Sequence, residues 1–510
     1  MFKSLAKVGS NTMLSRVLGF VRDLVLAHTF GANAGTDAFF VAFKIPNFLR
    51  RLFAEGSFSV AFVPVLAEYK AKRSMDELKL FVNHVAGTLG GILLLVTALG
   101  VLGAPVLVMI FAPGFIGVEG KMDLAADMLR LTFPYLLFIS LTAFAGSILN
   151  SHGRFGIPAF TPVLLNLSLI GCALWLAPQM ERPIVALAWG VLLAGIIQFL
   201  FQLPFLKQLG LLPKFSFAPK DEGVRRIVRL MLPAIFGVSV TQLNLLLDTL
   251  IASFLVDGSI SWLYYSDRLM EFPLGILGVG LATVILPSLS HKHASESPEG
   301  FSHTLNWALR WVLLLGVPCA VGLFLLSGPM IATMFQSDVF LPEDVSMAQR
   351  SLMAYSLGLI PFIMIKVLAP GYYARQDTKT PVRIAIIAMV SNMVFNIILV
   401  FPLAHAGLAL ATTLSACINA TMLFRGLGRE QVFQAEPGWP SLILRGLVAS
   451  VAMGVMLYFL GGTLDSWVGA ELWDKVWRLL ALILSGAAVY FAALLALGIR
   501  LRHFRSAEST

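Results

Sequence analysis

The chain has 510 residues, of which 58% are hydrophobic and only 13% are charged, and its mean hydropathy is +0.83. Six long runs without Asp, Glu, Lys or Arg, among them residues 80–118 and 384–424, exclude an ordinary soluble protein. The net charge of +9 does not indicate a nucleic-acid partner, because the basic residues fall in alternate loops between apolar segments.

Apolar segments long enough to cross a membrane follow one another along the whole chain. A crossing needs about 20 apolar residues, so the sequence predicts an all-α polytopic membrane protein with fourteen transmembrane helices. They lie near residues 8–30, 36–66, 80–112, 126–149, 158–178, 184–206, 228–255, 260–288, 305–328, 350–373, 382–402, 407–424, 442–463 and 477–499. The second and eighth contain Pro46 and Pro273, so we expect bends or breaks there.

Ten ionisable residues lie inside these apolar segments, where each is expensive to bury. They are Arg16, Arg22, Asp23, Asp37, Lys44, Arg50, Arg51, Asp267, Arg268 and Glu271. Such groups usually face a watery cavity and mark a substrate path. Five of them are arginines, whose planar fork donates two parallel hydrogen bonds to a phosphate. The pattern predicts an internal cationic cavity for an anionic substrate.

The first crossing carries three of these charges. Arg16 and Asp23 are seven residues apart and share roughly one face, whereas Arg22 lies about 120° round the helix and roughly 9 Å further along. We expect both arginines to face the cavity. The alternative is that they snorkel to the membrane interface.

The second crossing is the densest polar stretch of the chain. Pro46 removes a backbone donor, and an unwound segment at membrane depth is tolerated only where it lines a cavity. We expect Arg50 to contact the substrate and regard Arg51 as the candidate partner of Glu55. Because a carboxylate would repel an anionic substrate, Asp37 and Glu55 are expected to hold arginines in place.

The eighth crossing carries Asp267, Arg268 and Glu271. We interpret Arg268 as a further substrate contact, tuned by the two carboxylates. A purely structural pair is the alternative, because Arg268 and Glu271 stand at i, i+3 on a helix. Lys366 in the tenth crossing is either a fourth cation of the cavity or a snorkelling side chain.

A second group of polar residues could bind a cation. Asp248, Asn392, Asn396 and Thr412 all offer oxygen atoms, and a single carboxylate with neutral oxygens suits a monovalent cation such as Na⁺. The alternative is hydrogen bonding between packed helices. No other cofactor is predicted, and the three cysteines lie within apolar segments, which argues against a disulfide framework or a metal site.

No enzyme motif accompanies these charges. The sequence lacks a GxxxxGK[ST] phosphate loop and an HExxH zinc motif, and most histidines stand at loop ends. We therefore predict a transporter rather than an enzyme, without ATP as its energy source. Coupling to a Na⁺ or H⁺ gradient is a hypothesis that the sequence does not decide.

The distribution of cations predicts the topology. Loops near 70–79, 207–226 and 375–379 are basic, whereas loops near 113–123 and 338–347 carry few cations. The positive-inside rule places the first set in the cytoplasm and the second set outside. Both termini then belong to the cytoplasmic side, which agrees with an even number of crossings.

The second half of the chain resembles the first when the sequence is shifted by one fixed number of residues, which we call the offset. This offset places Pro64 on Pro287 and Pro158 on Pro381, at equivalent helix or loop positions. Each repeat would hold six crossings, an even number, so the two repeats share one orientation about an axis along the membrane normal.

The repeat predicts three regions. Residues 1–215 form an N-lobe, residues 216–435 form a C-lobe, and residues 436–510 hold the last two crossings and a cytoplasmic C-terminus. The charges do not repeat, since Asp37 maps on Ile260. A symmetric scaffold with asymmetric charges favours a ligand with two different ends.

Four segments resemble one known family. SRVLGFVRD (15–23), TDAFFVAFKIPNFLRRLFAEGSFS (36–59), YYSDRLMEFPLGILGVGLATVILPSLS (264–290) and YYARQDTKTPV (372–382) are similar to the bacterial MurJ (MviN) lipid II flippases. This family belongs to the multidrug/oligosaccharidyl-lipid/polysaccharide exporter superfamily. The resemblance runs essentially end to end, with Val60 where close relatives often carry Gln.

The resemblance implies a substrate and a place in the cell. Lipid II is undecaprenyl pyrophosphate bearing a disaccharide-pentapeptide, and the family flips it from the cytoplasmic to the outer leaflet during peptidoglycan synthesis. The implied location is the bacterial inner membrane, where cell-wall biogenesis and cell shape depend on this step. We expect a monomer surrounded by membrane lipids. The family's cavity arginines fall on Arg16, Arg22, Arg50 and Arg268, and the last two crossings would form a groove for the lipid tail.

Two other classes of protein stay open at this point. A drug/cation antiporter of the same superfamily would have an acid-dominated cavity and twelve crossings. A non-transporting membrane scaffold would have no charges at mid-helix depth. The arginines inside the predicted crossings favour the flippase over both.

Overall fold

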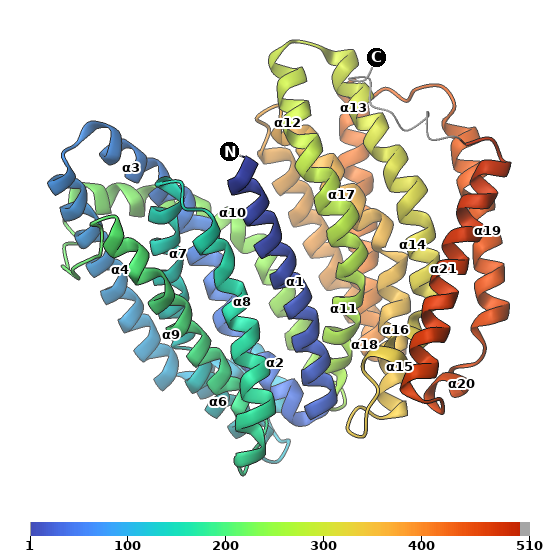
Figure 1. The fold of residues 1–510 in the computed structure, drawn as a ribbon, viewed down its shortest axis with the longest axis horizontal. Coiled ribbons are helices and arrows are strands. Elements are labelled where there is room, and N and C mark those ends of the chain that lie inside the picture. The colour runs from blue at the N-terminus through green and yellow to red at the C-terminus, as the bar shows by residue number, and fades with distance from the viewer. Residues whose placement is uncertain (1, 500–510) are drawn as a thin grey trace. The chain divides into compact units, whose positions relative to one another are not determined.

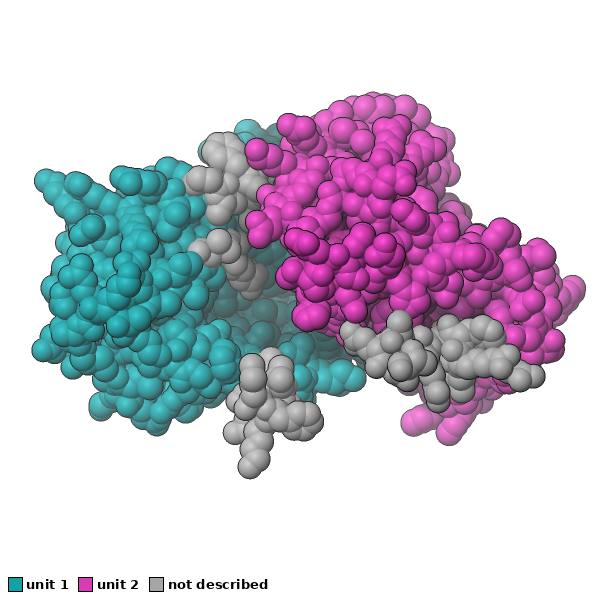
Figure 2. All heavy atoms as spheres, turned by 90° about the horizontal axis from the view of Figure 1, so that it is seen from above, with its two compact units in different colours: residues 1–261 teal, residues 262–510 magenta. Residues whose placement is uncertain are grey.

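The computed structural model describes residues 2–499, and every regular element in that range is helical. The side chains of residues 2–8, 53–56, 60, 233, 234, 236–238, 240 and 241 lie outside the description. The all-helical prediction is confirmed. The chain forms two compact units, residues 1–261 and 262–510, which Figure 2 colours teal and magenta.

Unit 1 contains the first ten α-helices (Figure 1). They are α1 (Phe2–Phe30), α2 (Ala34–Arg50), α3 (Ser59–Lys72), α4 (Met75–Leu102), α5 (Ala104–Phe111), α6 (Lys121–Thr132), α7 (Tyr135–Ser151), α8 (Gly156–Gly171), α9 (Val185–Gln208) and α10 (Glu222–Ala252). A π-helical stretch, η1 (Arg51–Phe58), joins α2 to α3 without a loop, and another, η3 (Cys172–Leu176), extends α8.

Unit 2 begins within α11 and contains the remaining helices. They are α11 (Ser259–Pro273), α12 (Gly280–Ala294), α13 (Pro298–Trp311), α14 (Val317–Leu325), α15 (Ser327–Met334), α16 (Pro342–Leu357), α17 (Leu359–Tyr373), α18 (Lys379–Arg429), α19 (Trp439–Gly461), α20 (Leu464–Val468) and α21 (Leu472–Ala496). Two π-helical stretches, η5 (Leu274–Val279) and η6 (Val312–Gly316), continue α11 and α13.

Two of the four π-helical stretches in the described range follow prolines at which the sequence predicted bends or breaks. Pro46 lies in the last turns of α2 and Pro273 ends α11, and a π-helical stretch comes next in each case. A proline removes one i→i−4 hydrogen bond, and a π-turn shifts the ladder to i→i+5. Within this stretch the Ser57 hydroxyl donates to the Leu52 carbonyl, five residues earlier, at 2.7 Å. The second crossing therefore stays helical at the point where unwinding was predicted.

Several helices have the length and composition of membrane spans. Within the described range, nine are long and apolar enough, and α16 with α17, bent by 41°, makes a tenth. The predicted crossings near 8–30, 36–66 and 228–255 are not among these spans, and of the last one only Gln242–Ala252 is found, as a shorter apolar helix within the described residues. Two of these three hold arginines proposed for the cavity, and their charges lower the mean hydropathy of those helices.

The longest helix is in fact two helices. α18 spans 51 residues but contains Ala404 with φ 48° and ψ −129°, outside helical values. The side chains of Asn392 and Thr412 form a hydrogen bond of 3.4 Å. A straight helix would separate residues 20 positions apart by about 30 Å, so the chain reverses at Ala404. The break falls between the predicted crossings near 382–402 and 407–424.

Helix boundaries recur at the offset that places Pro64 on Pro287. η1 begins at Arg51 and η5 begins at Leu274, which are equivalent positions under this offset. α5 and α15 coincide at both ends, and α4 with α13 and α8 with α18 coincide where they begin. The same order of long and short helices therefore occurs twice along the chain.

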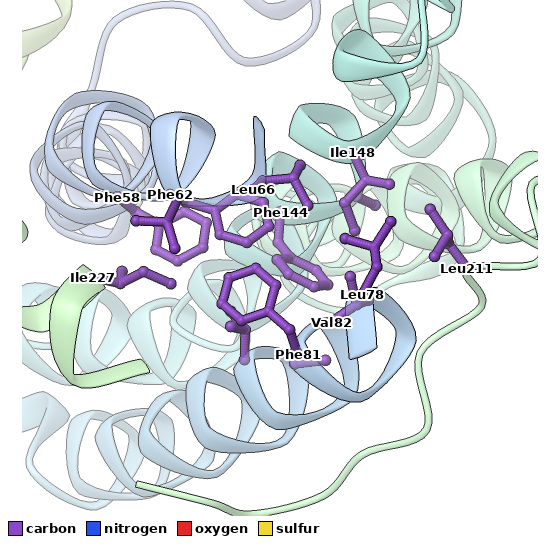
Figure 3. Close-up of a cluster of buried hydrophobic side chains, with 14 of the residues drawn as sticks. Phe58, Phe62, Leu66, Leu78, Phe81, Val82, Phe144, Ile148, Leu211 and Ile227 are labelled. Carbon is purple, nitrogen blue, oxygen red and sulfur yellow. The ribbon is translucent and has the colours of Figure 1, made fainter. Parts of the chain in front are cut away.

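An aromatic cluster forms the core of unit 1 (Figure 3). Phe62 on α3 lies 5.2 Å from Phe144 on α7 and 6.0 Å from Phe81 on α4, measured between ring centroids. Phe58 at the end of η1 stacks on Phe62 at 5.1 Å, and all four rings are buried. Buried aromatic pairs contribute roughly 0.5–1.5 kcal/mol beyond their burial. The cluster fixes the end of the π-helical stretch, and hence the segment that follows Arg50.

The predicted boundary between lobes lies in a segment that is packed on unit 1. The amide of Lys214 donates to Asn83 Oδ1 at 2.7 Å, and the amide of Ala218 donates to Thr88 Oγ1 at 3.1 Å. A Cβ at Gly87 would lie only 2.2 Å from the backbone of Ser216, so glycine permits this approach. The end of the first sequence repeat at residue 215 stays a prediction. The division into compact units is a different one and falls after residue 261.

The topology can be tested by cysteine labelling. We expect a cysteine at Glu119 to react with an impermeant thiol reagent in intact spheroplasts, because this exposed residue lies in the loop predicted to be external. Gly114 in the same loop is unsuitable, since a Cβ there would lie 2.2 Å from the Ser253 carbonyl oxygen. Ser74→Cys is the control for the opposite side. Labelling of Ser74→Cys with protection of Glu119→Cys would invert the predicted orientation.

Candidate substrate-binding residues

Arg22 is held inside unit 1 by two polar neighbours. Its Nε and Nη2 donate to Asp23 Oδ1 at 2.9 and 2.7 Å, and its Nη1 donates to Asn166 Oδ1 at 3.1 Å. Asn166 on α8 also donates to the Ser15 carbonyl at 3.0 Å, so the group joins α1 to α8. The Arg22 side chain is 13% exposed and that of Asp23 only 3%. Asp23 therefore supports Arg22, whereas the sequence had placed it on roughly one face with Arg16.

Arg16 has different surroundings. It lies on α1 six residues before Arg22, and its side chain is exposed. An exposed guanidinium keeps its donors available, whereas Arg22 already uses three of them on protein oxygens. The two arginines of the first crossing are therefore not equivalent.

The cations of α2 lie next to the π-helical stretch. Arg50 is half-buried, and its Nε donates to Asn47 Oδ1 at 2.8 Å. Arg51, also half-buried, is the first residue of η1. Lys44 Nζ donates to Thr249 Oγ1 on α10 at 2.5 Å. The side chain of Glu55, the predicted partner of Arg51, lies outside the described residues.

Asp37 has a role that the sequence did not indicate. Its carboxylate accepts hydrogen bonds from the amide of Gly258 at 2.8 Å and from the amide and hydroxyl of Ser261 at 2.9 and 2.7 Å. Lys121 Nζ lies 3.4 Å from it and 2.6 Å from Asp257. Asp37 is 1% exposed and Lys121 4%. Asp37 therefore joins α2, α6 and the start of α11, and these partners replace the arginine expected from the sequence.

Arg268 lies between both predicted carboxylates in unit 2. Its Nη1 is 2.8 Å from Glu271 Oε2, and its Nη2 is 3.8 Å from Asp267 Oδ2. The guanidinium also lies over the ring of Tyr264, 5.0 Å from the ring centroid, which is a cation–π distance. The side chain is 30% exposed and the two carboxylates are 35% and 48% exposed. The three charged side chains are therefore partly exposed rather than sealed in the protein interior.

Lys366 is exposed on α17 of the same unit. Its methylene stem lies beside Gly278 in η5, where an added Cβ would meet the stem at 3.4 Å. The ammonium group is thus anchored by its stem next to the π-helical stretch that follows Arg268 on the chain.

Three of the four residues of the predicted cation site come together on α18. Asn396 Nδ2 donates to Asn392 Oδ1 at 2.8 Å, and Asn392 Nδ2 donates to Thr412 Oγ1 at 3.4 Å. Both asparagines are fully buried. Asp248 is on α10 of unit 1. Among the described residues, no cluster of three or more His, Cys, Asp or Glu side chains could hold a metal ion.

The motif YYARQDTKTPV forms the turn that starts α18. Asp377 Oδ1 accepts the amides of Thr380 at 3.0 Å and Lys379 at 3.1 Å, an N-terminal cap. The hydrogen bonds from Thr380 hold the pKa of Asp377 below its ordinary value. Arg375 forms an ion pair of 2.6 Å with Glu430. This segment is a structural element rather than part of the arginine sites.

Some contributing residues were absent from the sequence prediction. Asn166, Tyr264 and Lys121 had no assigned role, although Asn166 is a strongly polar residue in an apolar segment. Polarity inside a predicted crossing is the signal that could have marked Asn166. Lys121 carried no such signal, because a lysine in a predicted loop is ordinarily solvated.

Together these observations define a class of protein. It is a multi-span helical membrane protein with arginines, partly buried and held by carboxylates, in both of its compact units. A solved multidrug MATE family transporter of the MOP superfamily, in an inward-facing conformation, has a similar fold, with a TM-score of 0.69. It is 14% identical, and the match covers 84% of this chain and 98% of that one. That likeness shows that the two chains share a fold.

The chain belongs to the lipid II flippase MurJ family, whose family model matches residues 26–476. A probable lipid II flippase MurJ of Haemophilus influenzae is 49% identical over 96% of this chain and 99% of its own length. The lipid II flippase MurJ of Burkholderia cenocepacia is 41% identical over 99% of each chain. A solved lipid II flippase MurJ in an inward closed conformation matches with a TM-score of 0.81 and 29% identity, over 95% of this chain and 97% of that one.

Proposed function

We propose that this chain flips lipid II from the cytoplasmic to the outer leaflet of the bacterial inner membrane, as a transporter rather than an enzyme. The observation that carries the proposal is the similarity to lipid II flippases over nearly the whole chain, at 41% to 49% identity. Lipid II carries a negatively charged pyrophosphate, and arginine is the side chain best suited to bind it. An antiporter for cationic drugs would not benefit from these arginines.

The proposal includes an architecture. Residues 1–215 and 216–435 would form two six-helix lobes that alternate access to a central cavity, and residues 436–510 would hold two further crossings beside a lipid-tail groove. The recurrence of helix boundaries at one offset and the chain reversal at Ala404 support fourteen crossings. An even number places both termini in the cytoplasm. A monomer suffices for this mechanism.

Arg50 and Arg268 provide the first test of the cavity. We expect Arg50→Ala and Arg268→Ala each to lower lipid II flipping roughly ten- to a hundredfold, because each removes a charge-assisted hydrogen bond to the pyrophosphate. Lysine at either position should restore only part of the rate, since the planar fork is lost. The measurement is lipid II flipping in proteoliposomes, with complementation of a strain depleted of its own flippase.

A matched control separates binding from general charge. Arg425 is an exposed arginine near the end of α18, and Arg425→Ala should leave flipping unchanged. Full flipping by Arg50→Ala and Arg268→Ala would remove these residues from the proposed cavity. Uniform loss in all three variants would indicate a general effect of surface charge.

We further propose that Asp248, Asn392, Asn396 and Thr412 form a site for a monovalent cation, so that a Na⁺ or H⁺ gradient resets the empty carrier. Three of these residues already lie within hydrogen-bonding distance in pairs. Asp248→Asn should then reduce flipping and remove its dependence on an imposed gradient. If that dependence persists, the asparagines serve only to pack the two halves of α18.

A further inference from the structure

A cavity in unit 2 is separate from the arginines assigned to lipid II. Its volume is about 310 Å³, and its wall combines two arginines with three apolar side chains: Arg310, Arg445, Leu314, Leu442 and Ile499. These residues belong to α13 and η6, to α19, and to the segment after α21. Figure 1 shows α19 and α21 side by side in red, with α13 in the same unit.

The wall of this cavity is fixed by a polar network. Asn306 on α13 accepts the amide of Glu436 at 3.2 Å and the indole N–H of Trp439 at 2.7 Å. Ser302 and Gln434 exchange two hydrogen bonds, of 2.9 and 3.1 Å. The link that leads into α19 is therefore held against α13 by these hydrogen bonds.

Among the described residues, the two arginines of the wall and the Glu436 carboxylate sum to one positive charge. Arg310 Nη2 forms an ion pair of 2.7 Å with Glu436, which also accepts from His303 at 2.6 Å. Arg445 is half-buried, and within the described part of the chain it has no acidic partner. One of the two arginines is thus neutralised and the other is not. A single negative charge matches this balance, whereas a pyrophosphate carries more.

Tryptophans place the cavity at the level of the membrane interface. Trp307 and Trp311 flank Arg310 on α13 and contact each other edge to face, with ring centroids 6.3 Å apart. Trp439 starts α19 six residues before Arg445. Tryptophan is enriched where the headgroups of a bilayer meet its hydrocarbon. Phospholipid phosphates lie at this level of a bilayer.

We propose that this cavity binds the phosphodiester headgroup of an anionic phospholipid. Arg445 would supply the charge-assisted hydrogen bonds, Ser441 a hydroxyl, and Leu314 and Leu442 the contacts to the lipid chains. A headgroup bound here bridges α13 and α19, and so fastens the last two membrane helices to the rest of unit 2. The site lies outside the arginine set that the proposed function uses.

The test uses the full-length chain, purified in a neutral detergent and titrated with short-chain phosphatidylglycerol. Lipids retained per protein are counted by native mass spectrometry. We expect Arg445→Gln to weaken retention roughly tenfold and Arg445→Lys to weaken it less. Arg425→Gln, which removes an exposed arginine outside the cavity, should retain the lipid as well as the parent chain does. An unchanged melting temperature without lipid verifies that Arg445→Gln is folded.

Two further arms identify the ligand. Phosphatidylcholine, whose headgroup has no net charge, should bind more weakly than phosphatidylglycerol, and inorganic phosphate should not displace the lipid. Equal retention of both lipids would overturn the assignment, because the cavity would then recognise only apolar chains. If millimolar phosphate displaced the lipid, the site would be assigned to a free anion and the lipid proposal would be wrong. If Arg445→Gln and Arg425→Gln lost equal amounts of retained lipid, the binding would depend on general surface charge and the proposed site would be wrong.

Discussion

Arg22→Ala is expected to abolish most lipid II export and to lower the free energy of unfolding by about 3 kcal/mol. The stability loss arises because Asp23, with a side chain only 3% exposed, would lose both hydrogen bonds from the guanidinium. Removing one partner of a buried ion pair leaves an uncompensated charge. The export loss follows from the proposed contact with the pyrophosphate. Flipping in proteoliposomes and thermal unfolding in detergent measure the two effects separately.

Two variants separate these effects. Arg226→Ala removes an ion pair of the same length, 2.7 Å to Glu68, but with side chains 50% and 37% exposed, so it should cost far less stability than Arg22→Ala. Arg22→Ala with Asp23→Ala should regain stability without regaining export. If the double variant transports normally, Arg22 serves only to compensate Asp23 and does not contact the substrate.

Lys121→Met is expected to destabilise unit 1 by about 3 to 5 kcal/mol, the largest stability effect that we foresee. Lys121 and Asp37 are 3% and 2% exposed at their side chains, and the ammonium also lies 4.3 Å from the ring centroid of Phe115. Without the Lys121 ammonium, the buried carboxylate of Asp37 would keep only the hydrogen bonds donated by Gly258 and Ser261. Thermal unfolding of the purified chain is the measurement.

The chain offers an exposed pair for comparison. Arg130 and Asp127 lie 2.7 Å apart with side chains 44% and 48% exposed, so Arg130→Met should change stability by less than about 1 kcal/mol. Adding Asp37→Asn to Lys121→Met should recover much of the loss, because an amide needs no counter-charge. A melting temperature of Lys121→Met equal to that of Arg130→Met would show that the buried pair contributes nothing.

The sequence predicted the helical framework well because its signals are local. Apolar runs fix where helices can span a bilayer, and Pro46 and Pro273 marked two of the four π-helical stretches in the described range. The break at Ala404 fell in the short gap between two apolar runs. Each of these features depends on residues within a few turns of one another, and such features can be derived from residue order.

The partners of the charges were harder to predict. Asp37 contacts Lys121 and Ser261, which are 84 and 224 residues away, and Asn166 is 144 residues from Arg22. Helical periodicity states which side chains share a face but not which helix packs against that face. Pairing within one helix was therefore foreseen correctly for Arg268 with Glu271, whereas the partners of Asp37 and Arg22 on other helices were not.

The recurrence of helix boundaries has an evolutionary consequence. η1 and η5, and both ends of α5 and α15, keep the same spacing, so neither copy has gained or lost net residues between these landmarks. This pattern indicates duplication of an ancestral segment, after which substitutions diverged while length did not. Arg51 in one copy corresponds to Leu274 in the other. The duplicated half kept its architecture, and the two halves then specialised in the charges that they present.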